Sequence, residues 1–497
     1  MFLLGFDVGS SSIKAALLEA ETQEAVASAA APAQEMPMKA ARPGWAEQDP
    51  ELWWQNVKSA TGQIIRASKV DPDDIAAVGI SYQMHGLVVV GKDKQVLRPA
   101  IIWCDSRAVE IGNKASEAIG PSICLERLLN SPGNFTASKL KWVQENEPEI
   151  YRRIYKAMLP GDYIAMRMSD TIVTTPSGLS EGIMWDFQKQ GLADLVLDHY
   201  GIDTDLLPEA APTFSVQGEL TKQAAEELGL RAGTKIAYRA GDQPNNAFSL
   251  NVLNPGEIAA TAGTSGVVYG VGDQPKYDFL SRVNTFVHVN SVVAEPRYGV
   301  LLCLNGTGIL NSWLKHNAAE GMNYEQINEL AAQAPAGGEG LFVFPYGNGA
   351  ERTLGNRDIG AMIYGLNFNT HGKAHLLRAG QEGIVFALNY GLKIMQEMGI
   401  KIETIRAGQA NMFLSALFAQ AFAAVTGAAV ELYNTDGAQG AARGAGGGGG
   451  VYKRIQQAFE RLRCTRVIEP QKPIREAYQD VYYKWQNILN TWMERKR

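Results

Sequence analysis

The segment FLLGFDVGSSSIKAALL, residues 2–18, decides the fold of this chain. It contains two apolar runs, residues 2–6 and 13–18, on either side of a short stretch rich in glycine and serine. Short apolar runs bounded by Gly and Ser are typical of β-strands joined by a tight turn. The sequence therefore predicts that the protein begins with a β-hairpin.

A second segment of the same design occurs about half the chain later. Residues 258–270, IAATAGTSGVVYG, again place a Gly-Thr-Ser-Gly turn between two apolar runs. Residues 254–256, Asn-Pro-Gly, precede this segment and favour a turn near a domain boundary. Two similar hairpins predict an α/β protein with two related domains, residues 1–248 and 249–497, each of which presents a hydroxyl-rich turn to a shared deep cleft.

The composition narrows the classes of partner. The chain has 497 residues, with 46 Lys and Arg against 52 Asp and Glu and a formal net charge of −6. This balance, without a basic cluster, argues against nucleic acid and anionic membranes as partners. The four cysteines are far apart and form no C-x-x-C pair, which argues against a disulfide framework or zinc ribbon and favours the cytoplasm. We therefore expect small-molecule substrates.

Helix and strand signals continue after the first hairpin. Residues 49–51, Asp-Pro-Glu, predict a helix start, because Asp is a favoured N-cap and Pro a favoured first helical residue. Strands are predicted at residues 76–81, 87–90 and 236–240 from their apolar patterns.

The C-terminal half contains one long uncharged stretch and one run of glycines. Residues 412–430 are uncharged but interrupted by polar residues, so we expect a buried helix and not a membrane span. The five glycines at 446–450 predict a flexible linker. Helices are predicted after it, over residues 451–463 and, with an amphipathic pattern, 474–497.

The two hairpin turns contain the residue types that bind phosphate. Backbone N–H groups of a glycine-rich turn can surround an anion, and short hydroxyls add further donors. The candidate phosphate ligands are Ser10, Ser11 and Ser12 in the first turn and Gly263, Thr264 and Ser265 in the second. Gly and Ser also favour turns for conformational reasons alone, so a purely structural role stays open for each turn. Neither turn has the Walker pattern.

Two aspartates stand where predicted strands end. Asp7 directly precedes the first turn, where one carboxylate can hold Mg²⁺ beside substrate phosphates. Asp242 follows the strand at 236–240 and is a candidate general base, because phosphoryl transfer needs a carboxylate to accept the proton of the acceptor hydroxyl. Two alternatives stay open, an Asx turn for Asp7 and a helix N-cap for Asp242.

The segment SYQMHG, residues 81–86, places polar groups between two strand patterns. Such groups are what a site for a polyhydroxylated ligand requires. His85 is one of six histidines, and a single histidine is more often structural than ligand-binding, so both roles stay open. No second His or Cys stands at metal-ligand spacing from it, so we do not expect His85 to bind a metal.

Together these motifs resemble those of the FGGY carbohydrate kinases, a family of the actin-like ATPase superfamily. The resemblance covers nearly the whole chain, through FDVGSSSIKAAL, SYQMHG, RPAIIWCDSR, AGDQPNNA, TAGTSG and GAQGAA in the order of the family. Within the family, GWAEQDPELWW at residues 44–54, QMHG and LRPAIIW are most similar to the xylulokinases. Three features depart from that pattern: Gln243 in place of Asn, RAGQAN at residues 406–411, and the glycines at 446–450 where the family has a helix.

The resemblance implies two ribonuclease-H-like domains, ATP and Mg²⁺ in the cleft, and transfer of the γ-phosphate to the terminal hydroxyl of a ketopentose, foremost D-xylulose. The residues implied for catalysis and the sugar are Asp242 as the base, Asp7 at the metal, and Met84, His85 and Gln243 at the sugar. The implied nucleotide ligands are the two hydroxyl-rich turns together with Gly408 and Asn411.

Several alternatives remain at the level of sequence. The acceptor of the kinase can instead be ribulose, glycerol or another ketose or polyol. A non-sugar actin-like ATPase needs neither the QMHG segment nor an acceptor base, and a catalytically silent sugar binder needs neither Asp7 nor Asp242. A homodimer is left open as the assembly state.

Overall fold

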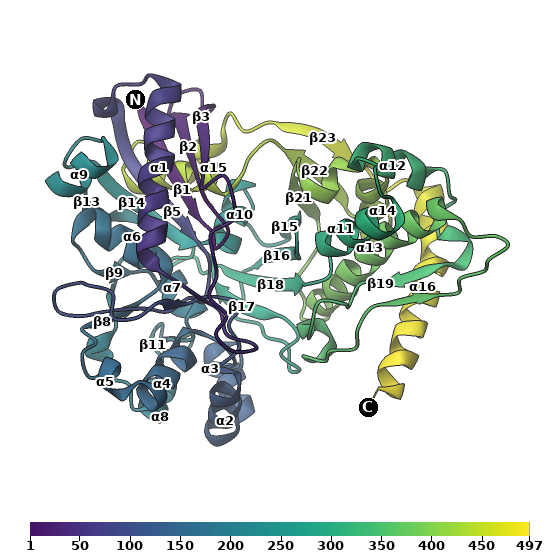
Figure 1. The fold of residues 1–497 in the computed structure, drawn as a ribbon, viewed down its shortest axis with the longest axis horizontal. Coiled ribbons are helices and arrows are strands. Elements are labelled where there is room, and N and C mark those ends of the chain that lie inside the picture. Colours follow the sequence, from purple (N-terminus) through teal and green to yellow (C-terminus); the bar gives the residue numbers. More distant parts are fainter. Residues whose placement is uncertain (497) are drawn as a thin grey trace. The chain divides into compact units, whose positions relative to one another are not determined.

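The computed structural model describes residues 1–496, which form two compact α/β units (Figure 1). Unit 1 consists of Met1–Asn251, Phe286–Tyr298 and Thr435–Leu462, and unit 2 of Val252–Thr285, Gly299–Asn434 and Arg463–Arg497. The predicted α/β class is confirmed. The division into domains at residues 1–248 and 249–497, and the shared cleft, stay predictions.

Unit 1 is built on a six-stranded sheet with the order β13-β14-β5-β1-β2-β3. The predicted hairpin is confirmed, because β1 (Phe2–Val8) pairs antiparallel with β2 (Ile13–Glu19). β5 (Ile75–Tyr82) is parallel to β1 on one side and to β14 (Lys235–Gly241) on the other. The carboxyl ends of three parallel strands therefore meet at one edge.

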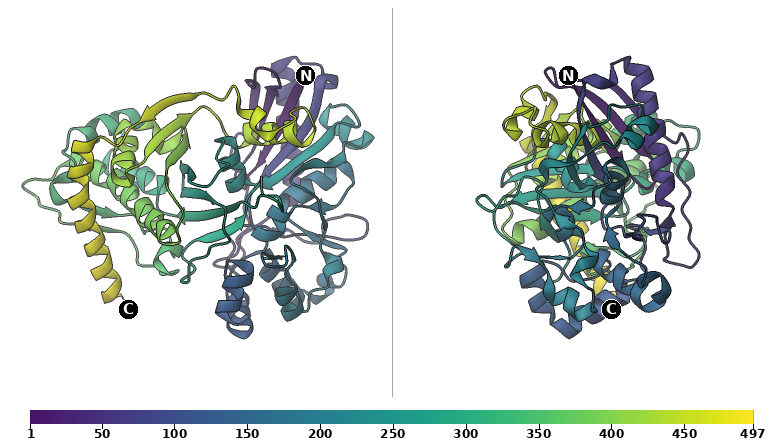
Figure 2. Two further views of the ribbon diagram at one scale, coloured as in Figure 1. Left: turned by 180° about the vertical axis from the view of Figure 1, so that it is seen from behind. Right: turned by 90° about the vertical axis from the view of Figure 1, so that its left-hand side faces the viewer.

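Helices cover both faces of this sheet. On one face, α1 (Pro50–Ser68) begins at its N-cap Asp49 as predicted and packs on β2 and β3 (Figure 1). On the other face, α15 (Gly437–Gly448) lies across β1, β5 and β14 (Figure 2). Alternate residues of a strand point to opposite faces, so a strand buried on both sides is apolar throughout, as β1 is in all but Asp7.

The prediction of a flexible linker at residues 446–450 is wrong, because the first three of these glycines belong to α15. Glycine costs about 1 kcal/mol relative to alanine in a helix, but it allows close approach of the helix to the sheet. A Cβ on Gly448 would lie 1.7 Å from the Ala237 carbonyl oxygen, and one on Gly79 of the sheet 2.0 Å from the Ala441 carbonyl oxygen. The helix over 451–463 is also wrong, since only a short 3₁₀ turn, η6 (Ile455–Phe459), forms there.

Unit 2 contains a seven-stranded sheet with the order β17-β18-β16-β15-β21-β22-β23. The second predicted hairpin is confirmed as β15 (Glu257–Ala262) and β16 (Gly266–Gly272). β21 (Thr404–Gly408) is parallel to β15 and to β22 (Ala429–Tyr433). Both units thus contain an antiparallel hairpin whose first strand pairs on its other side with a parallel strand, and that strand pairs with a further parallel strand.

Three long helices share the apolar core of unit 2: α13 (Lys373–Glu397), α14 (Ala416–Thr426) and the amphipathic C-terminal helix α16 (Lys472–Arg495). The buried helix predicted for residues 412–430 is present as α14 but is shorter, because β22 begins at Ala429. Among the described residues, no helix is both long and apolar enough to span a membrane.

The remaining elements are short connections and covering helices. In unit 1 they are β3 (Ala25–Ala31), β4 (Glu47–Gln48), η1 (Pro72–Asp74), β6 (Val88–Val90), β7 (Ala100–Ile101), α2 (Val109–Ile119), α3 (Pro121–Leu128), α4 (Thr136–Asn146), α5 (Pro148–Tyr151), β8 (Lys156–Met158), α6 (Pro160–Ser169), β9 (Val173–Thr174), α7 (Pro176–Glu181), β10 (Trp185–Asp186), β11 (Gly191–Leu192), α8 (Asp194–Tyr200), η2 (Thr204–Leu206), β12 (Glu209–Ala210), β13 (Phe214–Glu219), α9 (Lys222–Leu228) and α10 (Asp242–Ser249). The others are β17 (Asn284–Val287), β18 (Tyr298–Leu304), α11 (Gly308–Ala318), α12 (Tyr324–Ala332), η3 (Gly338–Gly340), β19 (Phe342–Phe344), η4 (Arg352–Leu354), β20 (Met362–Tyr364), η5 (Asn411–Leu414) and β23 (Cys464–Ile468).

Candidate active site

The register of the unit 1 sheet brings three predicted segments together. Tyr82 of β5 is opposite Val8 of β1 on one side and opposite Gly241 of β14 on the other. The first turn, the SYQMHG segment and Asp242 therefore leave the sheet side by side at its carboxyl edge. Ligands of parallel α/β sheets typically bind at this edge.

Asp7 is half-buried and is linked to the neighbouring strand. The Ser81 hydroxyl donates a hydrogen bond to Asp7 Oδ1 (2.9 Å). Burial raises the pKa of Asp7, and the negative charge of Asp436 adds to this, while Lys14 and the Ser81 bond oppose it. The turn is closed by its own backbone, through the Gly9 N–H and the Ser12 carbonyl (3.1 Å). The Asp7 carboxylate thus accepts a hydrogen bond from the neighbouring strand β5.

Asp242 is the first residue of α10, and the N-cap of that helix is Gly241. The alternative in which Asp242 is the N-cap is therefore wrong. Burial, followed by the negative charge of Asp7, raises the pKa of Asp242 to about 7, against hydrogen bonds from the backbone and side chain of Gln243. A carboxyl with a pKa near neutral pH has the protonation equilibrium that suits a general base.

Met84 and His85 lie next to this carboxyl edge. Met84 is buried, and a Cβ on Gly241 would lie 2.6 Å from its Cγ, so Met84 packs directly beside the residue that precedes Asp242. The His85 ring contacts the rings of Phe135 and Phe286, with centroid distances of 4.8 Å and 5.5 Å. The structure thus brings together Met84, His85, Asp242 and Gln243.

Residues from other segments of unit 1 form hydrogen bonds with the first turn. Trp103 Nε1 donates to the Ser10 hydroxyl (3.2 Å), and Gln48 Nε2 donates to the Ser10 carbonyl (2.7 Å). The Ser11 carbonyl accepts from the Met36 N–H (2.8 Å). These bonds fix the turn and leave it at the same sheet edge as Asp7.

The second turn lines a polar pocket of about 470 Å³ within unit 2. Of the predicted residues, Gly263, Thr264 and Asn411 line this pocket, whereas Ser265 and Gly408 are not among its lining residues. The N-terminal end of α11 also lines the pocket, and its Gly308 N–H donates a hydrogen bond to the Gly263 carbonyl oxygen (2.8 Å). A Cβ on Gly308 would lie 2.3 Å from that oxygen, so only glycine permits this contact.

Sequence reasoning missed nine further lining residues of this pocket: Ala262, Gly308, Asn311, Ser312, Tyr324, Asn328, Met412, Leu414 and Ser415. Its one available signal was the Gly-Thr-Gly stretch at 306–308, which directly follows a strand and begins a helix. A helix start of this kind is a common anion site.

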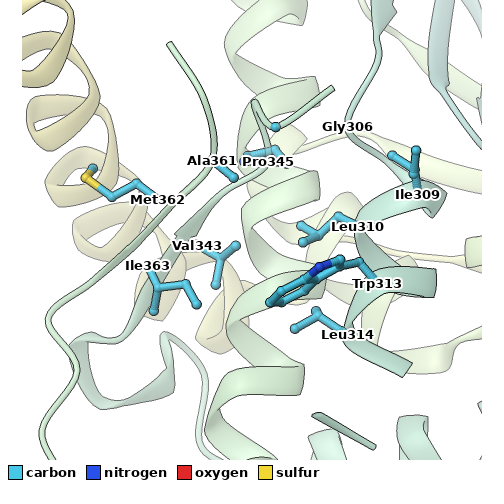
Figure 3. A pocket seen from close by; sticks show the side chains of 11 residues that line it. Gly306, Ile309, Leu310, Trp313, Leu314, Val343, Pro345, Ala361, Met362 and Ile363 are labelled. Atoms are coloured by element: carbon cyan, nitrogen blue, oxygen red, sulfur yellow. The ribbon is translucent and has the colours of Figure 1, made fainter. Parts of the chain in front are cut away.

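The opposite side of α11 borders a second, apolar pocket of about 520 Å³ (Figure 3). Its lining includes Ile309, Leu310, Trp313 and Leu314 of α11, and Ile363 of β20. The helix thus separates a polar pocket from an apolar one, and none of the predicted site residues lines the apolar pocket.

A divalent cation fits the residues at the unit 1 edge. Asp7 and Asp242 repel each other, and neither forms an ion pair within residues 1–496. The same residues contain no cluster of three or more His, Cys, Asp or Glu arranged to hold a metal alone. Mg²⁺ commonly takes only one or two carboxylates and completes its shell with water and phosphate oxygens. The donor set is therefore suited to Mg²⁺ that arrives with a nucleotide.

Two family models match this chain, the N-terminal domain of the FGGY family of carbohydrate kinases over residues 2–249 and the C-terminal domain over residues 258–447. The chain is 28% identical to the xylulose kinase of Bacillus subtilis, over 98% of this chain and 96% of that protein. It is 30% identical to the xylulose kinase of Escherichia coli, over 96% of this chain and 94% of that protein.

A solved structure shares the fold. The ligand-bound xylulose kinase of Lactobacillus acidophilus aligns with a TM-score of 0.90 and 23% identity, over 99% of this chain and 98% of that chain. The predicted actin-like fold of the chain is thereby confirmed. The chain therefore belongs to the FGGY family of carbohydrate kinases and is a carbohydrate kinase.

Proposed function

We propose that this kinase transfers the γ-phosphate of ATP to the terminal hydroxyl of a ketopentose, and that D-xylulose is its preferred acceptor. The observation that supports this most strongly is the position of Asp242, which has a pKa of about 7 and lies beside Met84 and His85 at the carboxyl edge of the sheet. The full-length similarity to two xylulose kinases supports the choice of sugar.

Asp242 is the proposed general base. Its carboxylate accepts the proton of the attacking hydroxyl as the oxygen of that hydroxyl bonds to the γ-phosphorus. The bond between that phosphorus and the bridging oxygen breaks, and ADP leaves with the electron pair. Positioning and charge neutralisation supply most of the catalysis in such a transfer, and the base supplies the remainder.

The sugar is assigned to the segment Gln83, Met84 and His85 together with Gln243. The Gln83 side chain is 2% exposed, and neither its amide nitrogen nor its amide oxygen has a hydrogen-bond partner within the described chain. Buried polar atoms without partners are costly, and a bound hydroxyl group would satisfy them. The carboxamide of Gln243, which is bonded to Asp242, is the other proposed contact with the sugar.

The nucleotide is assigned to the polar pocket of unit 2, and Gly408 and Ser265, which do not line it, stay candidate ligands. Ser10, Ser11 and Ser12 in unit 1 and Gly263 and Thr264 in unit 2 are the proposed phosphate ligands. Asp7 would hold Mg²⁺, which, when bound, neutralises charge on the phosphates. Residues 1–248 would thus supply the sugar site, the first phosphate turn and the base, and residues 249–497 the second phosphate turn and the adenosine site.

A coupled assay of ADP release tests this proposal. The purified chain should release ADP with D-xylulose at the highest kcat/KM among ketopentoses, pentitols and glycerol, and little without an acceptor. Vigorous ATP turnover that no sugar stimulates would favour a non-sugar actin-like ATPase. We also propose a cytoplasmic location, supported by four cysteines that form no disulfide bonds in the structure.

A further inference from the structure

His85 has a left-handed backbone conformation. Its φ is +61°, in the left-handed region that a side chain with a Cβ rarely occupies. Such conformations persist only where surrounding groups enforce them, and they concentrate at functional sites. Two buried residues from distant parts of unit 1, Lys139 and Glu181, bond to this one peptide position.

Glu181, the last residue of α7, forms two hydrogen bonds with His85, and its Oε2 also lies 3.7 Å from His85 Nδ1. The His85 N–H donates to Glu181 Oε2 (3.2 Å), and His85 Nδ1 lies 2.8 Å from the Glu181 carbonyl oxygen. A carbonyl oxygen only accepts, so Nδ1 carries the proton and Nε2 is the acceptor atom of the neutral ring. Glu181 thus determines both the backbone position and the tautomer of His85.

The Glu181 carboxyl is itself fully enclosed. It is 2% exposed, interacts with the Tyr82 hydroxyl, and lies close to Gly241, where a Cβ would be 3.2 Å from Oε2. Burial raises the pKa of Glu181 well above its ordinary value, which favours the uncharged carboxyl. An uncharged carboxyl still accepts the His85 N–H through its carbonyl oxygen.

Lys139 of α4 holds the other side of the same peptide. Its Nζ donates to the His85 carbonyl oxygen (2.8 Å) and to the Ile102 carbonyl oxygen (3.1 Å). The side chain has no solvent exposure, and burial lowers the pKa of Lys139 to about 8. Within residues 1–496 it forms no ion pair with a carboxylate. A buried ammonium bonded to backbone carbonyls is expensive, so its position calls for a specific explanation.

We propose that Lys139 and Glu181 are positioning residues that clamp His85 in its left-handed conformation and present Nε2 of its ring to a hydroxyl of the acceptor sugar. This inference rests on the proposed function, in which His85 contacts the sugar. In this inference, Lys139 and Glu181 change the affinity for the acceptor sugar only through their effect on His85.

Steady-state kinetics with the best acceptor of the ADP-release panel test the clamp. The variants are Lys139→Met, Glu181→Leu and Glu181→Gln, each alone and combined with His85→Ala. Lys139→Met and Glu181→Leu should raise the acceptor KM at least tenfold and leave the ATP KM within twofold. Glu181→Gln, which keeps an acceptor oxygen, should stay within threefold of the parent protein. In the His85→Ala background the first two changes should add less than twofold.

A matched control lies on the same helix. Lys141 is paired with Glu145 near the surface, and Lys141→Met should leave both Michaelis constants unchanged. Four outcomes would each overturn the clamp. The acceptor KM and the ATP KM could change equally, or neither could change. The effect could persist in the His85→Ala background, or Glu181→Gln could raise the acceptor KM as much as Glu181→Leu does. If Lys139→Met does not fold, the Glu181 pair makes the same test.

A readout without turnover separates this inference from the proposed function. In ¹⁵N-histidine spectra, with the His85 signals identified by their loss in His85→Ala, the neutral ring should be protonated at Nδ1. Glu181→Leu and Lys139→Met keep the Glu181 backbone carbonyl but remove a bond that holds the His85 peptide, so the ring should move away from that oxygen and the Nε2-protonated form should increase. If no sugar is phosphorylated but this shift occurs, the proposed function fails and the clamp on His85 stands. An unchanged tautomer in both variants would overturn the clamp whatever the activity.

Discussion

Ser81 donates its hydroxyl to Asp7 Oδ1 over 2.9 Å, and this bond joins the carboxyl ends of β1 and β5. It fixes the carboxylate whose negative charge, after burial, is the next cause of the raised pKa of Asp242. Two aspartates far apart in the chain therefore form one electrostatic unit. The raised pKa of Asp242 follows in part from the nearby charge of Asp7, and its effects on activity and stability can be measured.

Asp242→Asn should keep the fold and nucleotide binding but lose turnover by about 10²- to 10⁴-fold, because the amide cannot accept the hydroxyl proton. Initial rates and titration with ADP measure the two effects. Asp74→Asn, an exposed residue of η1, is the matched control and should behave as the parent protein. Turnover within a few-fold of the parent would contradict the role of Asp242.

The pH profile should show the same group. With a pKa of about 7, Asp242 loses its basic form as the pH falls, so kcat/KM should decline below pH 7 and approach a tenfold loss per unit. The profile is measured at saturating ATP with the best acceptor. A rate that stays flat down to pH 5 would show that no group with this pKa acts in the reaction.

Stability should change in the opposite sense. The pKa of Asp242 is raised from its ordinary value of 3.8 to about 7, so the folded state binds its proton more tightly and loses stability as the pH rises between these values. Asp242→Asn removes this penalty and should raise the Tm by a few degrees at pH 8 but much less at pH 4. Thermal unfolding at the two pH values is the measurement, and an equal shift at both would argue against the raised pKa.

His85→Ala should raise the acceptor KM with little effect on the ATP KM, because a residue that orients the acceptor contributes mainly to its binding. His85→Gly should show the same kinetics but unfold at higher temperature than His85→Ala, since glycine adopts a φ of +61° without a Cβ penalty. A stability gap of about 1 kcal/mol is expected. An effect confined to ATP would leave His85 a purely structural residue.

Gly448→Ala should destabilise unit 1, because its Cβ would lie 1.7 Å from the Ala237 carbonyl oxygen and the helix would have to move. Overpacking of this kind costs about 1–3 kcal/mol. Gly447→Ala is the control, since its Cβ would first meet the flexible end of Ile455. Urea unfolding compares the two variants, and equal stabilities would contradict the close packing of α15.

Local sequence patterns were sufficient for both hairpins, the cap of α1 at Asp49 and the C-terminal helix α16. In each case the signal and the structure lie within a few residues of each other, so turn chemistry, capping and apolar spacing identify the element. Asp7 and Asp242 were singled out in the same way, as carboxylates that end predicted strands. The resemblance of the motifs to a kinase family supplied their expected roles.

Only the tertiary structure decides the surroundings of those residues, and with them their pKa values and hydrogen bonds. The raised pKa of Asp242 requires the pairing of β1, β5 and β14, whose order in the sheet no local pattern encodes. The bonds from Lys139 and Glu181 to His85 join three segments that are far apart in the sequence, and no local sequence pattern predicts them. The glycines at 446–450 indicate a linker locally, yet the first three belong to α15. The absence of Cβ atoms lets this helix approach the sheet, and long-range packing there outweighs the low helix propensity of glycine.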